Sequence, residues 1–328
     1  MPLAKEIQML SDTTRGADIK PFLKWAGGKT QLLPAIEAKL VQLLQHKSSI
    51  DFIEPFAGSG AVLFFMLREY GKYVKHAVIN DINTTLTDCY LTIKHSPELL
   101  IKELAALEQQ YFSYASEEDR KKLFLEKREE FNHLQANPTR KSALMIFLNK
   151  TCFNGLYRVN SKGGFNVPFG RYANPTICNA PVIRANSEAL QKVEILNTDF
   201  TETERYIHAD AFFYIDPPYK PISTTASFNA YAKEGFVDED QVRLKEFCDT
   251  VHEGQAYFVQ SNSDTTNNDE SNNFFQELYQ DYTIEKVKAK RAINSKGSGR
   301  GEIFELLISN DSVLRNHQPA GKEALRTL

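Results

Sequence analysis

The segment FFYIDPPYK, residues 212–220, places an acid, two prolines and an aromatic ring next to one another. Its first four residues favour a strand that is buried on both faces, and the prolines must end that strand. Asp216 is therefore predicted at the carboxyl edge of a parallel sheet, where open α/β sheets bind ligands. The fixed proline φ angles would hold the Asp216 carboxylate, the Pro217 carbonyl and the Tyr219 ring as one rigid group. An ordinary strand-ending turn is the alternative.

A second candidate group lies in EPFAGSGAV, residues 54–62, where a strand gives way to a helix. Ala57 and Gly58 are small enough for the backbone to approach a ligand closely. The segment lacks the full G-x-G-x-x-G fingerprint, so alone it is equally compatible with a plain tight turn. The next predicted strand ends at Asp81, roughly 20 residues further on, where an acid can accept hydrogen bonds from both ribose hydroxyls. Together the two segments predict a cofactor that carries a nucleoside.

The segment FLKWAGGKTQLLP, which begins at residue 22, imitates the end of a Walker A loop at Gly28, Lys29 and Thr30. That loop requires a glycine five residues before Gly28, and Leu23 stands there, so an NTPase is rejected. The Trp25 indole and the Lys29 amine, just before a helix, suit contact with a cofactor or with nucleic acid better.

Strands and helices alternate along most of the chain, which predicts a doubly wound α/β sheet. Strands are expected in DFIEPF, HAVIND, VEILNT, AFFYID, QAYFVQS, YTIEKVKAK and EIFELLIS, and helices in GAVLFFMLREYG, in NTTLTDCYLTIKH and over about residues 239–252. Long charged helical stretches interrupt this alternation between residues 97 and 190. We therefore expect a catalytic domain at 21–96 and 191–310, an inserted, mostly helical domain at 97–190, and flexible ends at 1–20 and 311–328.

The charge is unevenly distributed along the 328 residues, whose net charge is −3. Residues 131–187 and 286–301 contain no Asp or Glu. Two basic patches on a slightly acidic protein favour a bound polyanion, although a solvated surface is the simpler alternative. The basic residues of these runs are Arg140, Lys141, Lys150, Arg158, Lys162, Arg171 and Arg184, and Lys286, Lys288, Lys290, Arg291, Lys296 and Arg300.

The four cysteines are scattered without paired spacing, so the sequence indicates neither a disulfide framework nor a metal site. No stretch approaches the roughly 20 apolar residues of a membrane span, and the first residues lack the apolar core of a signal peptide. A cytoplasmic protein without membrane or metal partners is expected.

Four motifs in order, FLKWAGGK, EPFAGSG, NDIN and DPPY, resemble those of the Dam-type DNA adenine-N6 methyltransferases, the D12 class, alpha group. The resemblance runs from about Pro21 to Asn310. It implies a Rossmann-like, S-adenosylmethionine-dependent methyltransferase sheet with an inserted, mostly helical target-recognition domain that contains a β-hairpin. FNGLYRVNSKGGFNVPFGRY, residues 153–172, resembles the target-recognition hairpin of the members that methylate adenine in GATC, with Lys162, Gly163 and Gly164 as its turn. Phe153 departs from the tyrosine of some relatives, which retains stacking and loses a hydroxyl contact.

The resemblance also implies the residues that bind the cofactor. Phe200 is expected to stack on the cofactor adenine while Asp199 accepts a hydrogen bond from its amine, although Phe200 is equally suited to a hydrophobic core. The expected cofactor contacts are Trp25, Lys29, Phe56, Ala57, Gly58, Asp81, Asp199, Phe200 and Asp216.

Double-stranded DNA is the implied partner, with the protein acting as a monomer. Arg158 is expected to read a guanine edge through two parallel hydrogen bonds, and Lys24 to contact the first guanine. Phe153 and Asn154 would wedge into the base stack, and Leu156 and Pro168 would meet the thymine methyl, or pack within the hairpin. The expected DNA contacts are thus Lys24, Phe153, Asn154, Leu156, Arg158 and Pro168, with Lys141 as a phosphate contact.

The resemblance assigns a chemical role to the rigid group at residues 216–219. The lone pair of adenine N6 is delocalised into the ring, and acceptors at its two hydrogens would draw it towards the methyl donor. Asp216 and Pro217 supply those acceptors, and Tyr219 gives the extruded base a ring to stack against. Direct transfer then needs neither a metal nor a covalent intermediate. An N4-cytosine or RNA adenine methyltransferase would keep the same loop; a catalytically silent DNA-binding regulator could lose Asp216 or Asp81, and both are present.

Overall fold

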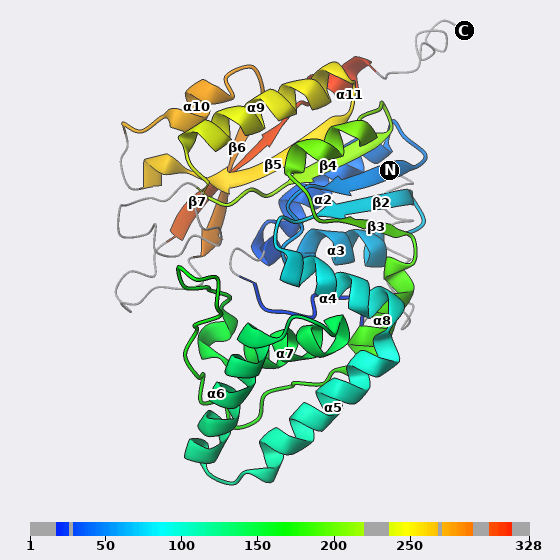
Figure 1. Ribbon diagram of the computed structural model, residues 1–328. Coiled ribbons are helices and arrows are strands. Elements are labelled where there is room, and N and C mark those ends of the chain that lie inside the picture. The colour runs from blue at the N-terminus through cyan, green and yellow to red at the C-terminus, as the bar shows by residue number, and fades with distance from the viewer. Residues whose placement is uncertain (1–17, 26–28, 220–235, 268–270, 291–301, 317–328) are drawn as a thin grey trace, which may run out of the picture.

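The computed structural model describes residues 18–25, 29–219, 236–267, 271–290 and 302–316. A seven-stranded sheet runs through them in the order β3-β2-β1-β4-β5-β7-β6 (Figure 1). Strands β1 to β5 are parallel, whereas β7 is antiparallel to both β5 and β6. The predicted doubly wound α/β sheet is confirmed, with an antiparallel pair at one edge. The strands are β1 Ile50–Glu54, β2 Val74–Asn80, β3 Val193–Leu196, β4 Ala211–Ile215, β5 Tyr257–Ser263, β6 Thr283–Lys290 and β7 Glu302–Ser309.

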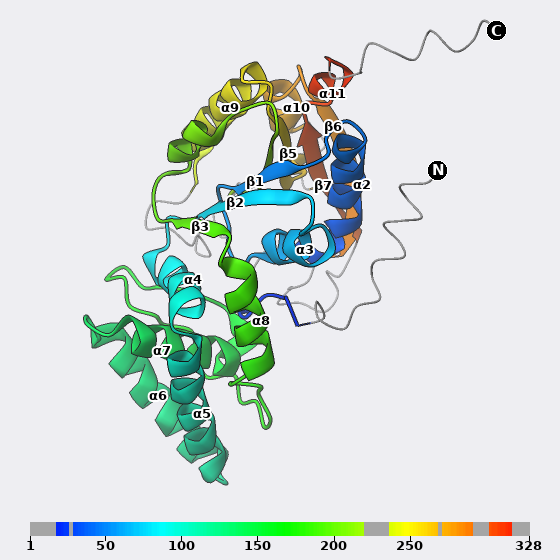
Figure 2. The ribbon, with the colours of Figure 1, turned by 90° about the vertical axis from the view of Figure 1, so that its right-hand side faces the viewer.

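Strand β4 shows why both faces of the sheet are covered. All five of its residues are buried, with Phe212 and Tyr214 in one hydrophobic cluster and Phe213 and Ile215 in another. Successive side chains of a strand point to opposite faces, so each cluster belongs to one face. Helices α2 Leu33–Leu44, α3 Ala61–Glu69 and α4 Thr84–His95 contribute to the first cluster, and α9 Asp238–Glu253 and α10 Phe274–Leu278 to the second (Figure 2).

A helical part of the chain, between α4 and β3, lies beside the sheet (Figure 1). Helix α7 is its centre, because residues 143–148 are all buried and α4, α5 and α6 contact this helix. Polar caps start α7 and the helix before it: Asn137 Oδ1 accepts from Arg140 N at 2.9 Å, and Ser116 Oγ accepts from Asp119 N at 3.0 Å. The helices of this part are α5 Pro97–Ser113, α6 Glu117–His133, α7 Pro138–Thr151 and α8 Ala180–Leu190.

The segment between α7 and α8 folds back on itself as the predicted hairpin, but its pairing is sparse. A short 3-10 turn, η2 Phe153–Gly155, opens it. Two isolated antiparallel bridges, Cys152 with Phe169 and Val159 with Phe165, join its two sides. At the tip Gly163 has a φ of 81°, which only glycine adopts readily, so the reversal falls inside the predicted turn.

The ordered chain continues beyond the predicted end of the sheet domain. Helix α11 Ser312–Asn316 follows β7, and Val313 is buried. Asp311 accepts hydrogen bonds from the Tyr257 hydroxyl and from Lys39 Nζ, each at 2.8 Å. The flexible tail predicted to start at residue 311 is therefore wrong for 311–316, because this ion pair anchors the chain to α2. Residues 317–328 of that tail, and 1–17 of the predicted flexible start, lie outside the described residues.

The four cysteines, Cys89, Cys152, Cys178 and Cys248, are unpaired thiols. Within the described ranges no three His, Cys, Asp or Glu side chains gather closely enough to hold a metal ion. The helices of those ranges also include none long and apolar enough to cross a bilayer.

Candidate active site

Parallel strands bring three motif segments to one edge of the sheet. The loop that follows β1, Asp81 after β2 and Asp216 after β4 all stand at carboxyl ends of neighbouring strands. That edge is where the sequence places a ligand crevice. Lys29, in the short 3-10 helix η1 Lys29–Gln31, reaches the same edge, where its ammonium lies 3.0 Å from Asp216 Oδ1. The predicted catalytic acid and the predicted lysine are thus in direct contact.

The Asp216 carboxylate is held on one oxygen. Oδ1 accepts a hydrogen bond from Ser261 Oγ at 3.0 Å in addition to its contact with Lys29, and Ser261 is hydrogen-bonded to the Tyr214 hydroxyl at 3.0 Å. Burial raises the pKa of Asp216, while the adjacent Lys29 charge lowers it. Since both contacts within the described part of the chain use Oδ1, Oδ2 is the oxygen that can accept a hydrogen bond from a substrate.

Tyr219 is anchored by an acid that the sequence reading did not identify. Its hydroxyl donates to Glu305 Oε2 at 2.7 Å and also accepts a close hydrogen bond from Lys29 Nζ. The Lys29 ammonium lies 3.7 Å from Glu305 Oε2 and 4.0 Å from the centroid of the Tyr219 ring. One face of the ring therefore meets a cation, and the opposite face is the one on which a base can stack. A lone acid before the buried run at residues 306–308 was the available signal for Glu305.

Asp81 closes a cradle made from the glycine loop. Its Oδ2 accepts from Gly58 N at 3.0 Å and its Oδ1 from Asn83 N at 2.9 Å. Burial raises the pKa of Asp81, and these two backbone donors lower it. Gly58 and Gly60 have φ values of 50° and 70°, and a Cβ on Gly58 would lie 3.1 Å from Trp25 Cδ1. The glycine backbone lets a ligand approach closely, and the Asp81 carboxylate can accept further hydrogen bonds beside it. This arrangement fits the ribose of a nucleoside cofactor.

Glu54 is a further acid beneath this edge, and sequence reading gave it no role. It is buried, and its Oε2 accepts from Leu63 N at 3.1 Å in the first turn of α3. Burial, followed by the negative charge of Asp216, raises the pKa of Glu54 well above its ordinary value. Through this hydrogen bond Glu54, the last residue of β1, ties the end of that strand to the start of α3.

Asp199 and Phe200 lie at the start of the 3-10 helix η3 Phe200–Tyr206, after β3. Phe200 is 5% exposed and packs against Phe56, with ring centroids 5.2 Å apart. The Arg243 guanidinium lies 4.6 Å from the centre of the Phe200 ring and forms a close ion pair with Asp199. Phe200 is thus packed as a core residue, and its stacking on a cofactor adenine stays a prediction. The amine contact expected of Asp199 also stays a prediction, because Arg243 and Thr201 N engage that carboxylate here.

Asn149 joins the hairpin to the segment before Lys29. This buried amide accepts from Lys24 N at 2.9 Å and donates to Lys24 O at 2.9 Å and to Gly155 O at 2.8 Å. Gly155 has a φ of 64°, and a Cβ there would collide with Lys24. Two predicted DNA-contacting segments, far apart in the sequence, are therefore neighbours in the fold.

The predicted reading residues of the hairpin are mostly exposed. Phe153 is 52% exposed, Asn154 has a φ of 56°, and Phe153 N donates to Pro168 O at 2.8 Å. Arg158 is exposed and is steadied by Asn166, which accepts from Arg158 Nε at 2.7 Å through its side chain. Leu156 is half-buried against the core. Asn166 was not singled out from the sequence.

In the fold, acids from other segments lie beside several basic residues of the acid-free run at 131–187, so its surface is less positive than the sequence suggests. Lys141 Nζ donates to Phe131 O and Leu134 O, so it links α7 to the end of α6, and its role as a phosphate contact stays a prediction. Lys150 behaves differently: burial, and then the positive charge of Lys24, lowers its pKa to about 8. Acids from outside the run pair with three of its arginines, Arg140 with Glu130 and Glu103, Arg171 with Glu117, and Arg184 with Glu98.

The second acid-free run, residues 286–301, is largely untested. Lys286 Nζ lies 2.8 Å from Asp264 Oδ2 and is therefore paired. Arg291, Lys296 and Arg300 lie outside the described residues.

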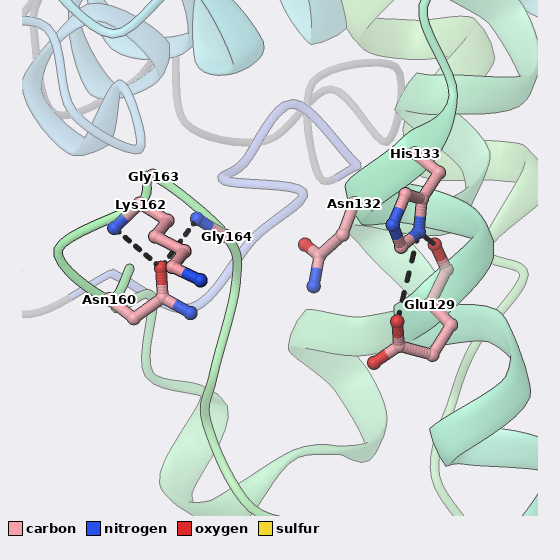
Figure 3. A pocket seen from close by; sticks show the side chains of 7 residues that line it. All are labelled: Glu129, Asn132, His133, Asn160, Lys162, Gly163 and Gly164. Atoms are coloured by element: carbon pink, nitrogen blue, oxygen red, sulfur yellow. Dashed lines mark hydrogen bonds and ion pairs between the residues drawn. The ribbon is translucent and has the colours of Figure 1, made fainter.

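A polar cavity of about 310 Å³ lies between the hairpin tip and the end of α6 (Figure 3). Asn132 fastens the hairpin there, accepting from Phe165 N at 2.8 Å and donating to Phe165 O at 3.2 Å. The Asn160 side chain accepts from Lys162 N and Gly164 N, which closes the turn. The hydrogen bonds of Asn132 at this cavity hold the hairpin to the helical part, and the walls of the cavity contain none of the predicted catalytic, cofactor-binding or DNA-binding residues. Its walls are Glu129, Asn132, His133, Asn160, Lys162, Gly163 and Gly164.

Comparison with known proteins shows which family and which proteins the chain is similar to. The model of the D12 class N6 adenine-specific DNA methyltransferase family matches residues 25–293. The Type II methyltransferase M.MjaIII of Methanocaldococcus jannaschii is 45% identical over 296 residues, which cover 89% of this chain and 99% of that protein. The DNA adenine methylases of Vibrio cholerae O395 and Escherichia coli K12 are 34% and 32% identical, over 88% of this chain and 95% and 94% of their own. A solved rRNA methyltransferase, aviRa from Streptomyces viridochromogenes, is 11% identical with a TM-score of 0.36, over 92% of this chain and 94% of that one.

Proposed function

Because the chain belongs to the D12 class of N6 adenine-specific DNA methyltransferases, we propose that it methylates the adenine of GATC, with Asp216, Pro217 and Tyr219 as its catalytic group. The family membership supports the adenine chemistry and the use of S-adenosylmethionine as the cofactor. The exposed guanidinium of Arg158 carries the choice of target, because it stands on the hairpin whose sequence resembles the GATC-reading members.

The catalytic proposal rests on how the acceptors are held. Asp216 Oδ2 accepts one hydrogen of the adenine amine and the Pro217 carbonyl accepts the other, which turns the N6 lone pair out of conjugation. Lys29 and Ser261 hold Oδ1, so the carboxylate of Asp216 is oriented, and the Lys29 charge favours its ionised form. The base stacks on the face of Tyr219 that Lys29 leaves open. S-adenosylmethionine, when bound, supplies the electrophilic methyl group.

The cofactor cradle is proposed at the glycine loop. Gly58 and Ala57 present bare backbone, Asp81 receives the ribose hydroxyls, and Trp25 covers the loop from above Gly58. Lys29, Phe56, Asp199, Phe200 and Asp216 complete the proposed set of contacts.

DNA is proposed to lie across the hairpin and the adjoining Lys24 segment. Arg158 Nε donates to the Asn166 side chain, and Arg158 Nη2 donates one hydrogen to Asn166 O at 3.2 Å. The hydrogens of Nη1 and the second hydrogen of Nη2 can then bind a guanine edge. Phe153 and Asn154 are the proposed wedge, and Lys24 contacts the first guanine. Leu156 and Pro168 are proposed to meet the thymine methyl.

The division of labour between the two parts of the chain is also proposed. The sheet part, residues 21–96 and 191–310, would perform the chemistry, and the helical part, residues 97–190, would hold the target. One copy of the chain carries every residue in this scheme, which supports action as a monomer. Light scattering of the protein on a single-site duplex tests this, since a two-to-one complex as the active species would contradict it.

The target is tested by sequencing methylated bases in DNA from cells that express the protein. GATC should be the modified site. In a separate assay with a tritium-labelled methyl donor, defined RNAs and duplexes that offer only cytosine N4 should receive no label. Initial rates on GATC and its single-base variants then test Arg158→Ala, which should lose about 1 to 3 kcal/mol of preference at one base pair. Arg184→Ala is the matched control, an exposed arginine paired with Glu98 on α5. A uniform slowing of all sites by Arg158→Ala would remove its reading role.

A further inference from the structure

Tyr157 lies between two proposed DNA contacts but faces the opposite way. Its neighbour Arg158 is exposed, whereas Tyr157 is 8% exposed. Its ring stacks on the Trp25 indole, with centroids 5.3 Å apart and planes 23° from parallel. Phe165 of the hairpin packs against it at 5.9 Å. The hairpin thus sends one large side chain inward, onto a proposed cofactor contact.

The contacts of Tyr157 converge on the cradle around Asp81. The Trp25 ring beneath it covers Gly58, since a Cβ there would lie 3.1 Å from Trp25 Cδ1. Burial raises the pKa of the Tyr157 hydroxyl, and hydrogen bonding towards the side chains of Thr85 and Asn83 opposes that rise. Gly58 and Asn83 are the two residues whose backbone N–H groups hold Asp81. One hairpin side chain therefore stacks on the ring that covers Gly58 and lies beside Asn83, the two residues whose N–H groups hold Asp81.

We propose that Tyr157 is a positioning residue that couples target reading to cofactor binding. A duplex that seats Leu156 and Arg158 fixes the hairpin backbone on both sides of Tyr157. Its ring then fixes Trp25 over Gly58, and its hydroxyl fixes Asn83, so the cradle is ordered before the cofactor enters. Such coupling is reciprocal, so bound cofactor must tighten the duplex by the same factor. The inference rests on the proposed reading role of the hairpin.

The experiment measures the affinity for S-adenosylhomocysteine by calorimetry, with and without a duplex that contains the site the wild type is found to methylate. This product of the reaction is a probe that transfers no methyl group. In the wild type the duplex should tighten the probe by about tenfold, within the usual range of coupling between sites. The quantity compared among variants is the ratio of the probe's affinity with duplex to its affinity without duplex. Tyr157→Leu keeps an apolar side chain but loses the stack and the hydroxyl, and its ratio should fall to about one. Tyr157→Phe keeps the stack, and its ratio should fall by about twofold to fivefold.

Phe165→Leu is the matched control, because it loosens the hairpin on the other side of Tyr157 and touches neither Trp25 nor Asn83 by any contact described above. Its ratio should stay near that of the wild type. A wild-type ratio of one overturns the proposal, and so does Tyr157→Leu if it weakens the probe equally with and without duplex. If Tyr157→Leu does not fold, Tyr157→Phe decides alone, and an unchanged ratio is then the refuting result. Failure of the proposed function is distinguishable from failure of the coupling, because the wild type would then leave GATC unmethylated.

Discussion

Glu305 on β7 holds the two side chains that flank Asp216, so its replacement should slow methyl transfer. Its Oε2 accepts from the Tyr219 hydroxyl at 2.7 Å and lies 3.7 Å from Lys29 Nζ. Two substitutions separate these contacts. Glu305→Gln keeps an acceptor for Tyr219 and removes the charge, whereas Glu305→Ala removes both.

The expected magnitude follows from the hydrogen bond and the charge. A hydrogen bond to a charged group contributes about 1.5 to 3 kcal/mol, so Glu305→Ala should slow the reaction by about 10- to 150-fold if the bond fixes Tyr219 in the transition state. Glu305→Gln keeps a neutral bond and should lose about fivefold. Burial is the main cause of the raised pKa of Asp216, and the negative charge of Glu305 adds to the rise. Removing that charge lowers this pKa, and the ionised, active form of Asp216 then persists to lower pH.

Initial rates of tritiated methyl transfer to a saturating duplex, measured across the acid limb of the pH profile, test both effects. Glu285→Gln is the control, because Glu285 on β6 pairs with Lys39 at 2.6 Å and touches neither Tyr219 nor Lys29 in the contacts described here. Thermal unfolding of each variant confirms that it is folded. A Glu305→Ala enzyme within about twofold of the wild type, or a Glu305→Gln enzyme with an unmoved acid limb, would show that Glu305 does not position the catalytic group.

Three further predictions concern single side chains. Asp216→Ala should fold and abolish methyl transfer, because the acceptor for the amine is lost; near-normal turnover of the purified variant would sink the mechanism. Asp81→Ala should weaken S-adenosylmethionine binding by about 3 kcal/mol through two lost ribose hydrogen bonds while leaving duplex binding without cofactor largely unchanged, and calorimetry with unaltered cofactor affinity would refute this. Lys150 should lose its charge as pH rises through about 8, so the logarithmic salt slope of duplex binding should become shallower by about 0.9 in the wild type and stay constant with pH in Lys150→Met.

The strands of the sheet were predictable because their local signals are strong. AFFYID is apolar on both faces and ends in prolines, and the structure places β4 there, in the middle of the sheet. The position of β7 between β5 and β6 was not predictable, since alternation along a strand carries no information about its direction or neighbours. The order of residues 311–316 depends on the Lys39–Asp311 ion pair, whose members are 272 positions apart.

The candidate site divides in the same way. Asp216 could be predicted because prolines end its strand, and Asp81 because it ends the strand that follows the glycine loop. Glu305 and Ser261 were missed, because each acts through a contact with a segment distant in the sequence and neither sits in a turn motif. The surroundings of Lys141 could not be predicted for the converse reason. The run around it lacks acids along the chain, but folding places backbone carbonyls of α6 around its ammonium and acids from other helices beside its neighbours.

The distribution of charge explains why the phosphates and the target base must be held in different places. Among the residues that the structure describes, Asp216 and Glu305 share the sheet edge with one close cation, Lys29, so this part of the edge disfavours a phosphate backbone. A neutral base meets no such repulsion and finds two acceptors for its amine. Lys24 and Lys150 lie close enough for the charge of one to lower the pKa of the other, and no acid is paired with either in the contacts of the described residues. On the proposed placement of the DNA, a phosphate between them would relieve that repulsion and hold the backbone at the base of the hairpin, while the target base would swing out to reach Asp216.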